Sequence, residues 1–359
     1  MRLKFFQFFI LVWLIFSPFL LFAQKMECKI GAADTSAYFS LIKNKKIALV
    51  VNQTSVVNGI HLVDFLQKAG FHISIIFAPE HGFRGVADAG EKINAEKDSK
   101  TGLTIASLYG KNYKPSAEQL ADVDVVIFDI QDVGARFYTY ISTMHYVMEA
   151  CADLKKTFVV LDRPNPNRHI IDGPILDLNL RSFVGMHPIP VVHGLTVGEL
   201  ALMISGEKWL SSQNSCQLFV VPCTDYSSKN RYILPIKPSP NLPNQRAIVL
   251  YPSLCLLEGT MMSMGRGTDF PFQVFGHPSF QVKHFSFTPK ANEGNKKPLF
   301  EGKICFGEDW RESDSKKFEF SLEPVIISWK NTGKPKDFFT SFLISWWETH
   351  RFALLLSQA

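Results

Sequence analysis

The chain has 359 residues, of which 46% are hydrophobic and 20% charged, a globular composition that excludes an intrinsically disordered protein. Its formal net charge of +5 is a mild bias, and no run of Lys and Arg interleaved with aromatic residues indicates a nucleic-acid partner. The length leaves room for about two domains.

The N-terminus has the form of a secretory signal peptide. Arg2 and Lys4 precede an apolar run from Phe5 to Phe22, and Ala23 offers a small residue for cleavage. An uncleaved membrane anchor is the alternative, because the run approaches the length that spans a bilayer. We expect residues 1–23 to be removed, which predicts a secreted or periplasmic protein with no stable membrane span.

From Lys45 onward, short apolar runs alternate with amphipathic helical patterns. The predicted strands cover 46–51, 73–77, 123–130, 158–161 and 217–221, and the predicted helices cover 61–69, 139–154 and 196–206. Continuous apolar strands that alternate with helices are typical of a parallel sheet covered on both faces. The sequence therefore predicts an α/β, Rossmann-like domain over residues 28–245.

The pattern changes after about Arg231, where prolines become frequent and the alternation of strands and helices stops. We place a domain boundary near residue 245. The remainder, 246–359, is predicted to be a smaller α+β domain.

Several kinds of chemistry lack their motifs in this chain. There is no G-x-G-x-x-G after the first strand, no phosphate-binding loop that ends in Gly-Lys-Ser/Thr and no G-x-S-x-G turn. The cysteines form no C-x-x-C pair, and the histidines form no H-x-H or H-E-x-x-H pair. We therefore expect neither a cofactor nor a metal ion.

Polar side chains cluster where the predicted strands end. The candidates are Asn52 after the first strand; Glu80, His81 and Arg84 after the second; Asp129, Gln131, Asp132, Arg136 and Tyr138 after the third; Arg163 and Asn165 after the fourth; and His193 after a fifth, short apolar run. Ligands of open parallel sheets bind outside the carboxyl ends of the strands. Ordinary loop polarity explains any one cluster, but it explains all of them together less well.

Carboxylate and aromatic chemistry remains, and glycoside cleavage is one form of it. That reaction needs an acid to protonate the leaving oxygen, and usually a second carboxylate. Desolvation in a partly apolar loop disfavours a charged carboxylate, which suits Glu80 to the acid role; the alternative is a salt bridge with Arg84. Asp129 and Asp132 are candidates for the second carboxylate, and Asp129 could equally brace its loop. Tyr138 is either a platform for a sugar ring or a core aromatic.

Several segments are long enough to compare with a known family. They are APEHGFRG from Ala78, DIQDVGARFYTYISTM from Asp129, LDRPNPNRHIIDGPILD from Leu161 and EGTMMSMGRGTDFPFQVFGHP from Glu258. Together with the spacing between them, these segments resemble the NamZ family of exo-β-N-acetylmuramidases. The resemblance covers nearly everything from Lys45 to about Phe339.

The resemblance implies a Rossmann-like catalytic domain, a smaller C-terminal domain and a cleft between them. It implies release of N-acetylmuramic acid from the non-reducing ends of peptidoglycan fragments, so the expected partner is a muropeptide or a MurNAc-GlcNAc saccharide. The glutamate of the APEHGFRG-type motif, here Glu80, would be the catalytic acid. Two other functions stay open, namely a non-catalytic binder of wall fragments and another hydrolase, such as an esterase or amidase.

The proposed substrate suggests roles for the remaining polar residues. Muramic acid carries a lactyl carboxylate, for which the available cations are Arg84, Arg136, Arg163 and Arg266. Its acetamido group needs hydrogen-bonding partners, for which Asn52, Gln131 and Asn165 are available. We expect Glu258 and the glycine-flanked Arg266 to close one side of the cleft; the alternative is a purely structural turn.

The tail after Ile344 departs from the text expected of this family. A shifted reading frame would restore the match, so we expect a frameshifted and truncated tail and an incomplete C-terminal domain. Resequencing the gene end tests this hypothesis, and an intact reading frame would contradict it.

Overall fold

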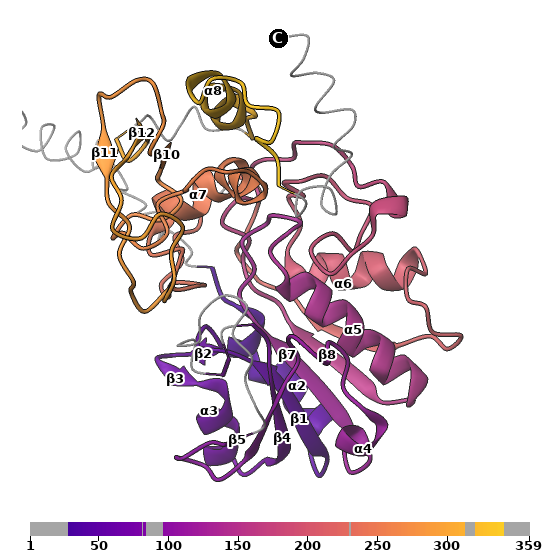
Figure 1. Cartoon of the computed structure of the whole chain (residues 1–359). Helices are drawn as coiled ribbons and strands as arrows, with labels where there is room; N and C mark the ends of the chain where they lie inside the picture. Colours follow the sequence, from indigo (N-terminus) through magenta and orange to yellow (C-terminus); the bar gives the residue numbers. More distant parts are fainter. Residues whose placement is uncertain (1–27, 81, 84–95, 230, 313–319, 341–359) are drawn as a thin grey trace, which may run out of the picture.

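A computed structural model describes residues 28–80, 82–83, 96–229, 231–312 and 320–340 of the chain. The predicted signal peptide lies outside these residues. A sheet-based part is drawn from indigo to pink in Figure 1, and a C-terminal part, orange to yellow, packs beside it. Within the described residues, no helix has both the length and the apolar character needed to cross a bilayer.

The sheet has the strand order β5–β6–β4–β1–β7–β8–β9. The strands are β1 (Lys46–Val51), β4 (His72–Ala78), β5 (Glu96–Lys97), β6 (Thr104–Ser107), β7 (Val125–Asp129), β8 (Thr157–Leu161) and β9 (Gln217–Val221). Every neighbouring pair is parallel except β5–β6, which is antiparallel. The predicted parallel α/β sheet is confirmed.

Helices cover both faces of this sheet. They are α2 (Thr35–Ile42), α3 (Leu62–Lys68), α4 (Ala117–Leu120), α5 (Tyr140–Asp153) and α6 (Val197–Gly206). Leu49 of β1 belongs to the hydrophobic cluster of α2 and α3, whereas its neighbour Val50 belongs to that of α4, α5 and α6. Successive strand residues point to opposite faces, so a sheet buried on both sides has uninterrupted apolar strands.

The start of α6 follows the capping pattern of its sequence. The hydroxyl of Thr196 accepts a hydrogen bond from the backbone N–H of Glu199, and the Glu199 side chain accepts one from the backbone N–H of Thr196. The Thr196 hydroxyl also donates to Asp162, at the end of β8, over 2.7 Å. The predicted helix over 196–206 is confirmed, and its cap anchors α6 beside the carboxyl end of the sheet.

The C-terminal part is α+β, as predicted. It contains α7 (Gln245–Leu254), α8 (Glu323–Asn331) and an antiparallel sheet in the order β10 (Val274–His277), β12 (Cys305–Asp309) and β11 (Ser286–Phe287). One hydrophobic cluster contains both Met144 of α5 and Tyr251 of α7, so the two parts share a continuous core. We retain residue 245 as the proposed boundary, because α7 begins there.

Two local predictions differ from the structure. The strand β6 was not predicted, because its four residues, Thr104–Ser107, begin and end with a hydroxyl side chain and form no apolar run. The apolar run before His193 was predicted to be a fifth strand of the rim, and this is wrong. Its Val192 forms only isolated bridges, to Ala135 and to Asp172, outside the named strands.

Candidate active site

Glu80 lies two residues after β4, at the carboxyl end of the sheet, and is partly exposed. Its Oε2 accepts a hydrogen bond from the hydroxyl of Thr139, over 3.2 Å. Thr139 immediately precedes α5, so it comes from the loop after β7. A second hydrogen bond joins the Glu80 carboxylate to the hydroxyl of Tyr109, which lies just after β6. Glu80 is therefore oriented by hydroxyl groups from two other strand ends.

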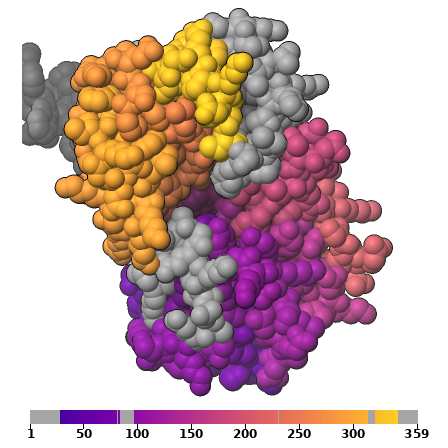
Figure 2. Space-filling model, in the orientation of Figure 1, coloured from indigo at the N-terminus to yellow at the C-terminus, as the bar shows by residue number. Residues whose placement is uncertain are grey.

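Tyr109 connects Glu80 with the C-terminal part. Burial raises the pKa of Tyr109, and the neighbouring carboxylates of Glu80 and, more weakly, Glu258 raise it further. Glu258 follows α7, so carboxylates from both parts raise the pKa of this one phenol. The surface in Figure 2 is recessed where the orange C-terminal part meets the sheet-based part.

Tyr140 connects Glu80 with a second carboxylate, Asp132. Its ring is buried, and burial is the largest cause of its raised pKa. The charges of Glu80 and Asp132 both contribute to the same increase. The charges of two of the predicted carboxylates thus act on one buried tyrosine.

Asp132 is buried in the loop after β7 and pairs with His193. Its Oδ2 accepts the backbone N–H of Gly134 over 2.7 Å and lies 3.5 Å from Nε2 of His193. Nδ1 of His193 accepts the backbone N–H of Leu195 over 3.2 Å, so a neutral ring carries its proton on Nε2, which faces Asp132. Oδ1 of Asp132 has no hydrogen-bond partner within the described part of the chain. A buried oxygen in that state favours a water molecule or a ligand as its partner.

Asn52 is a buried amide at the end of β1. Its Oδ1 accepts hydrogen bonds from the backbone N–H and the hydroxyl of Thr54, over 2.9 and 2.6 Å. Its Nδ2 makes no well-formed hydrogen bond to any described residue, although the side chain faces the Tyr140 hydroxyl. Asn52 therefore offers one oriented donor on the Glu80 side of the sheet.

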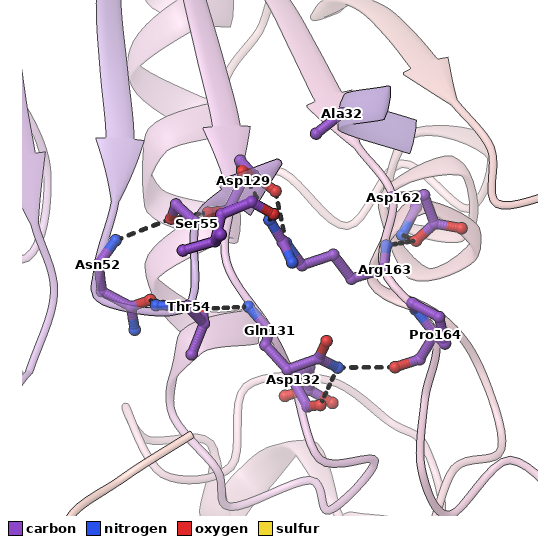
Figure 3. Close-up of polar contacts among 12 residues, drawn as sticks. Ala32, Asn52, Thr54, Ser55, Asp129, Gln131, Asp132, Asp162, Arg163 and Pro164 are labelled. Atoms are coloured by element: carbon purple, nitrogen blue, oxygen red, sulfur yellow. Dashed lines mark hydrogen bonds and ion pairs between the residues drawn. The ribbon is translucent and has the colours of Figure 1, made fainter. Parts of the chain in front are cut away.

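Asp129 and Arg163 form a buried bidentate ion pair (Figure 3). Nε and Nη2 of Arg163 donate to Oδ1 and Oδ2 of Asp129 over 2.5 and 2.9 Å. The backbone carbonyl of Asp129 also accepts the hydroxyl of Ser55. This geometry favours the bracing role for Asp129 over the catalytic one. It also ties Arg163 to a protein carboxylate rather than to a substrate carboxylate.

The amides Gln131 and Asn165 also hold loops together. Nε2 of Gln131 donates to the backbone carbonyls of Asp132 and Pro164 over 2.8 and 2.6 Å (Figure 3). Nδ2 of Asn165 donates to the carbonyl of Leu195 over 2.9 Å. Both side chains therefore fasten neighbouring strand ends, and neither amide nitrogen faces an open site.

Arg136 is buried against backbone carbonyls. Its Nη1 donates to the carbonyls of Pro174 and Ile189 over 2.8 and 2.6 Å. Burial lowers its pKa to about 10. The guanidinium holds the segment that leads to His193 against the sheet, so the predicted role in binding a lactyl carboxylate does not fit its position.

Tyr138 fits the core alternative better than the sugar-platform alternative. Its ring is buried edge-on against Tyr140 and Tyr251, with centroid distances of 4.8 and 5.7 Å. Its hydroxyl donates to the backbone carbonyl of Pro238 over 2.9 Å, and Nε2 of Gln53 donates to the same carbonyl over 3.0 Å. These bonds hold the proline-rich segment before α7 against the carboxyl end of the sheet.

Glu258 and Arg266 pair with each other at the start of the C-terminal part. Both Nε and Nη2 of Arg266 donate to Oε1 of Glu258, the first over 2.9 Å. The guanidinium also stacks on the ring of Phe272, with 5.0 Å between Cζ and the centroid. Gly265 and Gly267 flank Arg266 with φ values of +78° and +82°, which explains glycine at both positions.

The predicted residues His81 and Arg84 lie outside the described residues. Among the residues that are described, no three His, Cys, Asp or Glu side chains are grouped to hold a metal ion. The structure also adds two residues that the sequence did not predict, Tyr109 and Thr139. Tyr109 was missed because β6 was missed, and Thr139 was read only as part of a helix.

A partly exposed carboxylate, held by two hydroxyl groups at the carboxyl end of a Rossmann-like sheet, is the arrangement expected of an α/β enzyme whose catalytic group is a carboxylate. Residues 47–246 match the N-terminal family model of exo-β-N-acetylmuramidase NamZ, and residues 249–357 match the C-terminal one. The chain belongs to the NamZ family. The second match runs across the stretch after Ile344, where we expected the resemblance to fail.

The chain is similar to one curated protein and to two solved structures. The chain is 39% identical over 300 residues to the peptidoglycan β-N-acetylmuramidase NamZ of Bacillus subtilis, covering 79% of this chain and 72% of that protein. It is 45% identical to a DUF1343 family protein of Bacteroides fragilis, whose crystal structure superposes with a TM-score of 0.85 over 92% of this chain and 90% of that one. A second such protein from the same organism is 32% identical, with a TM-score of 0.73 over 83% and 80%.

Proposed function

We propose that this chain is an exo-acting glycoside hydrolase that releases N-acetylmuramic acid from the non-reducing ends of peptidoglycan fragments. The observation that carries the proposal is the setting of Glu80, a partly exposed carboxyl group held by Thr139 and Tyr109 at the end of β4. Membership of the NamZ family and the peptidoglycan β-N-acetylmuramidase of B. subtilis support the same reaction.

Glu80 acts as the general acid. It donates its proton to the glycosidic oxygen as the bond to the anomeric carbon breaks, and water supplies the anomeric hydroxyl group of the released N-acetylmuramic acid. The hydroxyl groups of Thr139 and Tyr109 hold the carboxyl group in one orientation, so little entropy is lost when the substrate arrives.

Asp132 is the second carboxylate. Its Oδ1 is unpaired within the described chain, the backbone N–H of Gly134 fixes Oδ2, and Nε2 of His193 lies 3.5 Å from Oδ2. An oriented negative charge stabilises the oxocarbenium-like transition state at the sugar ring. Asn52 lies on the same side and donates from Nδ2 to the acetamido carbonyl of the bound sugar.

The test is hydrolysis of the disaccharide MurNAc-GlcNAc, followed by chromatography of the free N-acetylmuramic acid. We expect Glu80→Gln to lower kcat by at least about 100-fold, the lower range for a general acid. Calorimetry should show that the variant still binds the disaccharide. Glu207→Gln, an exposed glutamate after α6, is the matched control and should keep full activity.

Other outcomes would favour the other functions. Binding of the disaccharide without turnover by the wild-type chain would indicate a non-catalytic binder. Turnover that is unchanged in Glu80→Gln would contradict the assignment of the acid and favour another hydrolase chemistry.

We also propose that the chain is exported through residues 1–23, on the basis of the charged and apolar pattern that ends at Ala23. Mass spectrometry of the protein recovered from the periplasm or medium should find Gln24 at the N-terminus. A protein that retains Arg2 and Lys4 would contradict cleavage.

A further inference from the structure

Four aromatic side chains form a connected group beside Glu80. They are Tyr109, Tyr113, Tyr146 and Phe183, and we call them the aromatic ladder. The Phe183 ring stacks on that of Tyr113, with centroids 4.1 Å apart and planes 28° apart. Tyr109 lies 6.0 Å from Phe183, and Tyr146 lies 6.1 Å from Tyr113. The ladder therefore runs from the Glu80 hydrogen bond to the surface of α5.

The ladder is assembled from three separate segments. Tyr109 and Tyr113 belong to the loop after β6, Tyr146 belongs to α5, and Phe183 lies between β8 and α6. All four side chains are partly exposed. By contrast, the neighbouring Tyr138 and Tyr140 are buried. An aromatic group that three segments present to solvent together is a feature of binding surfaces.

Glu80 is linked to two different aromatic environments. Its hydrogen bond to Thr139 joins it to the start of α5, where the next residue is the buried Tyr140. Because β4 and β6 are paired strands, Tyr109 leaves the sheet beside Glu80, and Tyr109 begins the exposed ladder. An enzyme that removes terminal sugars needs an enclosed place for the terminal ring and an open path for the rest of the chain. The buried Tyr140 and the partly exposed Tyr109 beside Glu80 fit these two requirements.

We propose that the aromatic ladder binds the sugars on the leaving-group side of the scissile bond, through stacking of their C–H faces on its rings. The ligand class is an N-acetylglucosamine-containing glycan longer than a disaccharide. This inference rests on the proposed function and adds to it that the enzyme favours longer glycan fragments. Tyr109 contacts the first leaving sugar, and Phe183, Tyr113 and Tyr146 contact the sugars beyond it.

The experiment compares two substrates, the disaccharide MurNAc-GlcNAc and the tetrasaccharide MurNAc-GlcNAc-MurNAc-GlcNAc. Initial release of N-acetylmuramic acid is measured for the wild type, Phe183→Ala and Tyr113→Ala. We expect kcat/KM for the tetrasaccharide to fall roughly fivefold to tenfold, the size of one aromatic contact. The value for the disaccharide should stay within about twofold of the wild type on the same argument.

Two further variants sharpen the comparison. Phe183→Trp retains an aromatic face and should restore the preference for the tetrasaccharide. Phe219→Ala removes a partly exposed ring from β9, which lies on the opposite side of the sheet from β6. This variant should leave kcat/KM unchanged for both substrates. Thermal unfolding of each variant shows whether a loss is due to the fold.

If Phe183→Ala and Tyr113→Ala lower kcat/KM equally for both substrates, the proposed role of the aromatic ladder is wrong. The proposed function would not be affected by that result. If the wild type cleaves neither substrate, the proposed function fails instead. The ladder is then tested by calorimetry with the trisaccharide GlcNAc-MurNAc-GlcNAc. Weaker binding in Phe183→Ala than in Phe219→Ala would support it, and equal binding would overturn it.

Discussion

Asp129 and Asp132 lie three positions apart after β7, and both are buried. Both oxygens of Asp129 are engaged by Arg163 in a bidentate pair. One oxygen of Asp132 accepts the Gly134 N–H and lies 3.5 Å from Nε2 of His193, and the other oxygen has no hydrogen-bond partner among the described residues. The charge of Asp129 is thus neutralised by an ion pair, whereas one oxygen of Asp132 remains available to a ligand.

The difference separates the rim of the sheet into two regions. The region around Asp129, Arg163 and Asn165 satisfies its own hydrogen bonds and holds the strand ends together. The region around Asp132 and Asn52 leaves one acceptor, Oδ1 of Asp132, and one donor, Nδ2 of Asn52, without a hydrogen-bond partner among the described residues. Burial of an unpaired polar group costs free energy, so a chain that retains one at this place is expected to use it.

The largest expected effect comes from a substitution that breaks the ion pair between Asp129 and Arg163. Asp129→Asn leaves the Arg163 guanidinium buried without its counter-charge, and we expect a loss of about 3–5 kcal/mol in the free energy of unfolding. Urea unfolding measures it. The control is Asp122→Asn, whose ion pair with Lys46 is exposed to solvent and should contribute less than about 1 kcal/mol. Similar losses in both variants would show that Asp129 does not brace the fold.

The second largest effect is expected from a substitution at Asp132. Asp132→Asn removes a negative charge but can still accept the Gly134 N–H, so the fold should keep its stability. We expect kcat for N-acetylmuramic acid release to fall about 100-fold, as for the loss of other groups that stabilise a transition state. The comparison with Asp129→Asn is made on folded protein. It fails if Asp129→Asn lowers kcat as strongly as Asp132→Asn does.

A third, smaller effect tests the junction between the two regions. Gly134 has a φ of +78°, and a Cβ at this position would lie 2.2 Å from Oδ1 of Asn165. We expect Gly134→Ala to cost about 2 kcal/mol through backbone strain and this clash. Gly59 has the same φ but no atom within 4 Å of such a Cβ, so Gly59→Ala isolates the backbone contribution. If Gly134→Ala and Gly59→Ala lower the Tm equally, the contact between residue 134 and Asn165 does not contribute to the loss of stability.

The smallest expected effect concerns pH. His187 is buried, its Nε2 lies 3.0 Å from Nδ1 of His145, and burial lowers its pKa well below 6.5. The unfolded chain therefore takes up a proton below about pH 6.5 that the native chain does not. Stability is complete above that pH and falls as the pH decreases, by about 1 kcal/mol between about pH 6.5 and 5.5. His187→Gln should flatten this dependence, and an unchanged slope in urea unfolding would contradict the assignment.

The candidate site could be predicted in part. Glu80, Asp132 and His193 were found because they follow apolar runs, and a short local pattern carries that signal. Tyr109 was missed because β6 has only four residues, and they are too polar for the strand to be predicted from an apolar run. The roles of Arg136 and Arg163 could not be predicted, because a guanidinium in the sequence does not show whether its partner is a substrate or the protein.

The sequence by itself determined the parallel sheet, the start of α6 and the family, because periodic burial, capping and long motifs are local properties of the chain. Only the tertiary structure decided which carboxylate is paired. Asp129 meets Arg163 from 34 positions away, and Glu80 meets Thr139 from 59 positions away. The packing of β1, β4, β7 and β8 into one sheet sets these contacts, and no spacing along the chain specifies them.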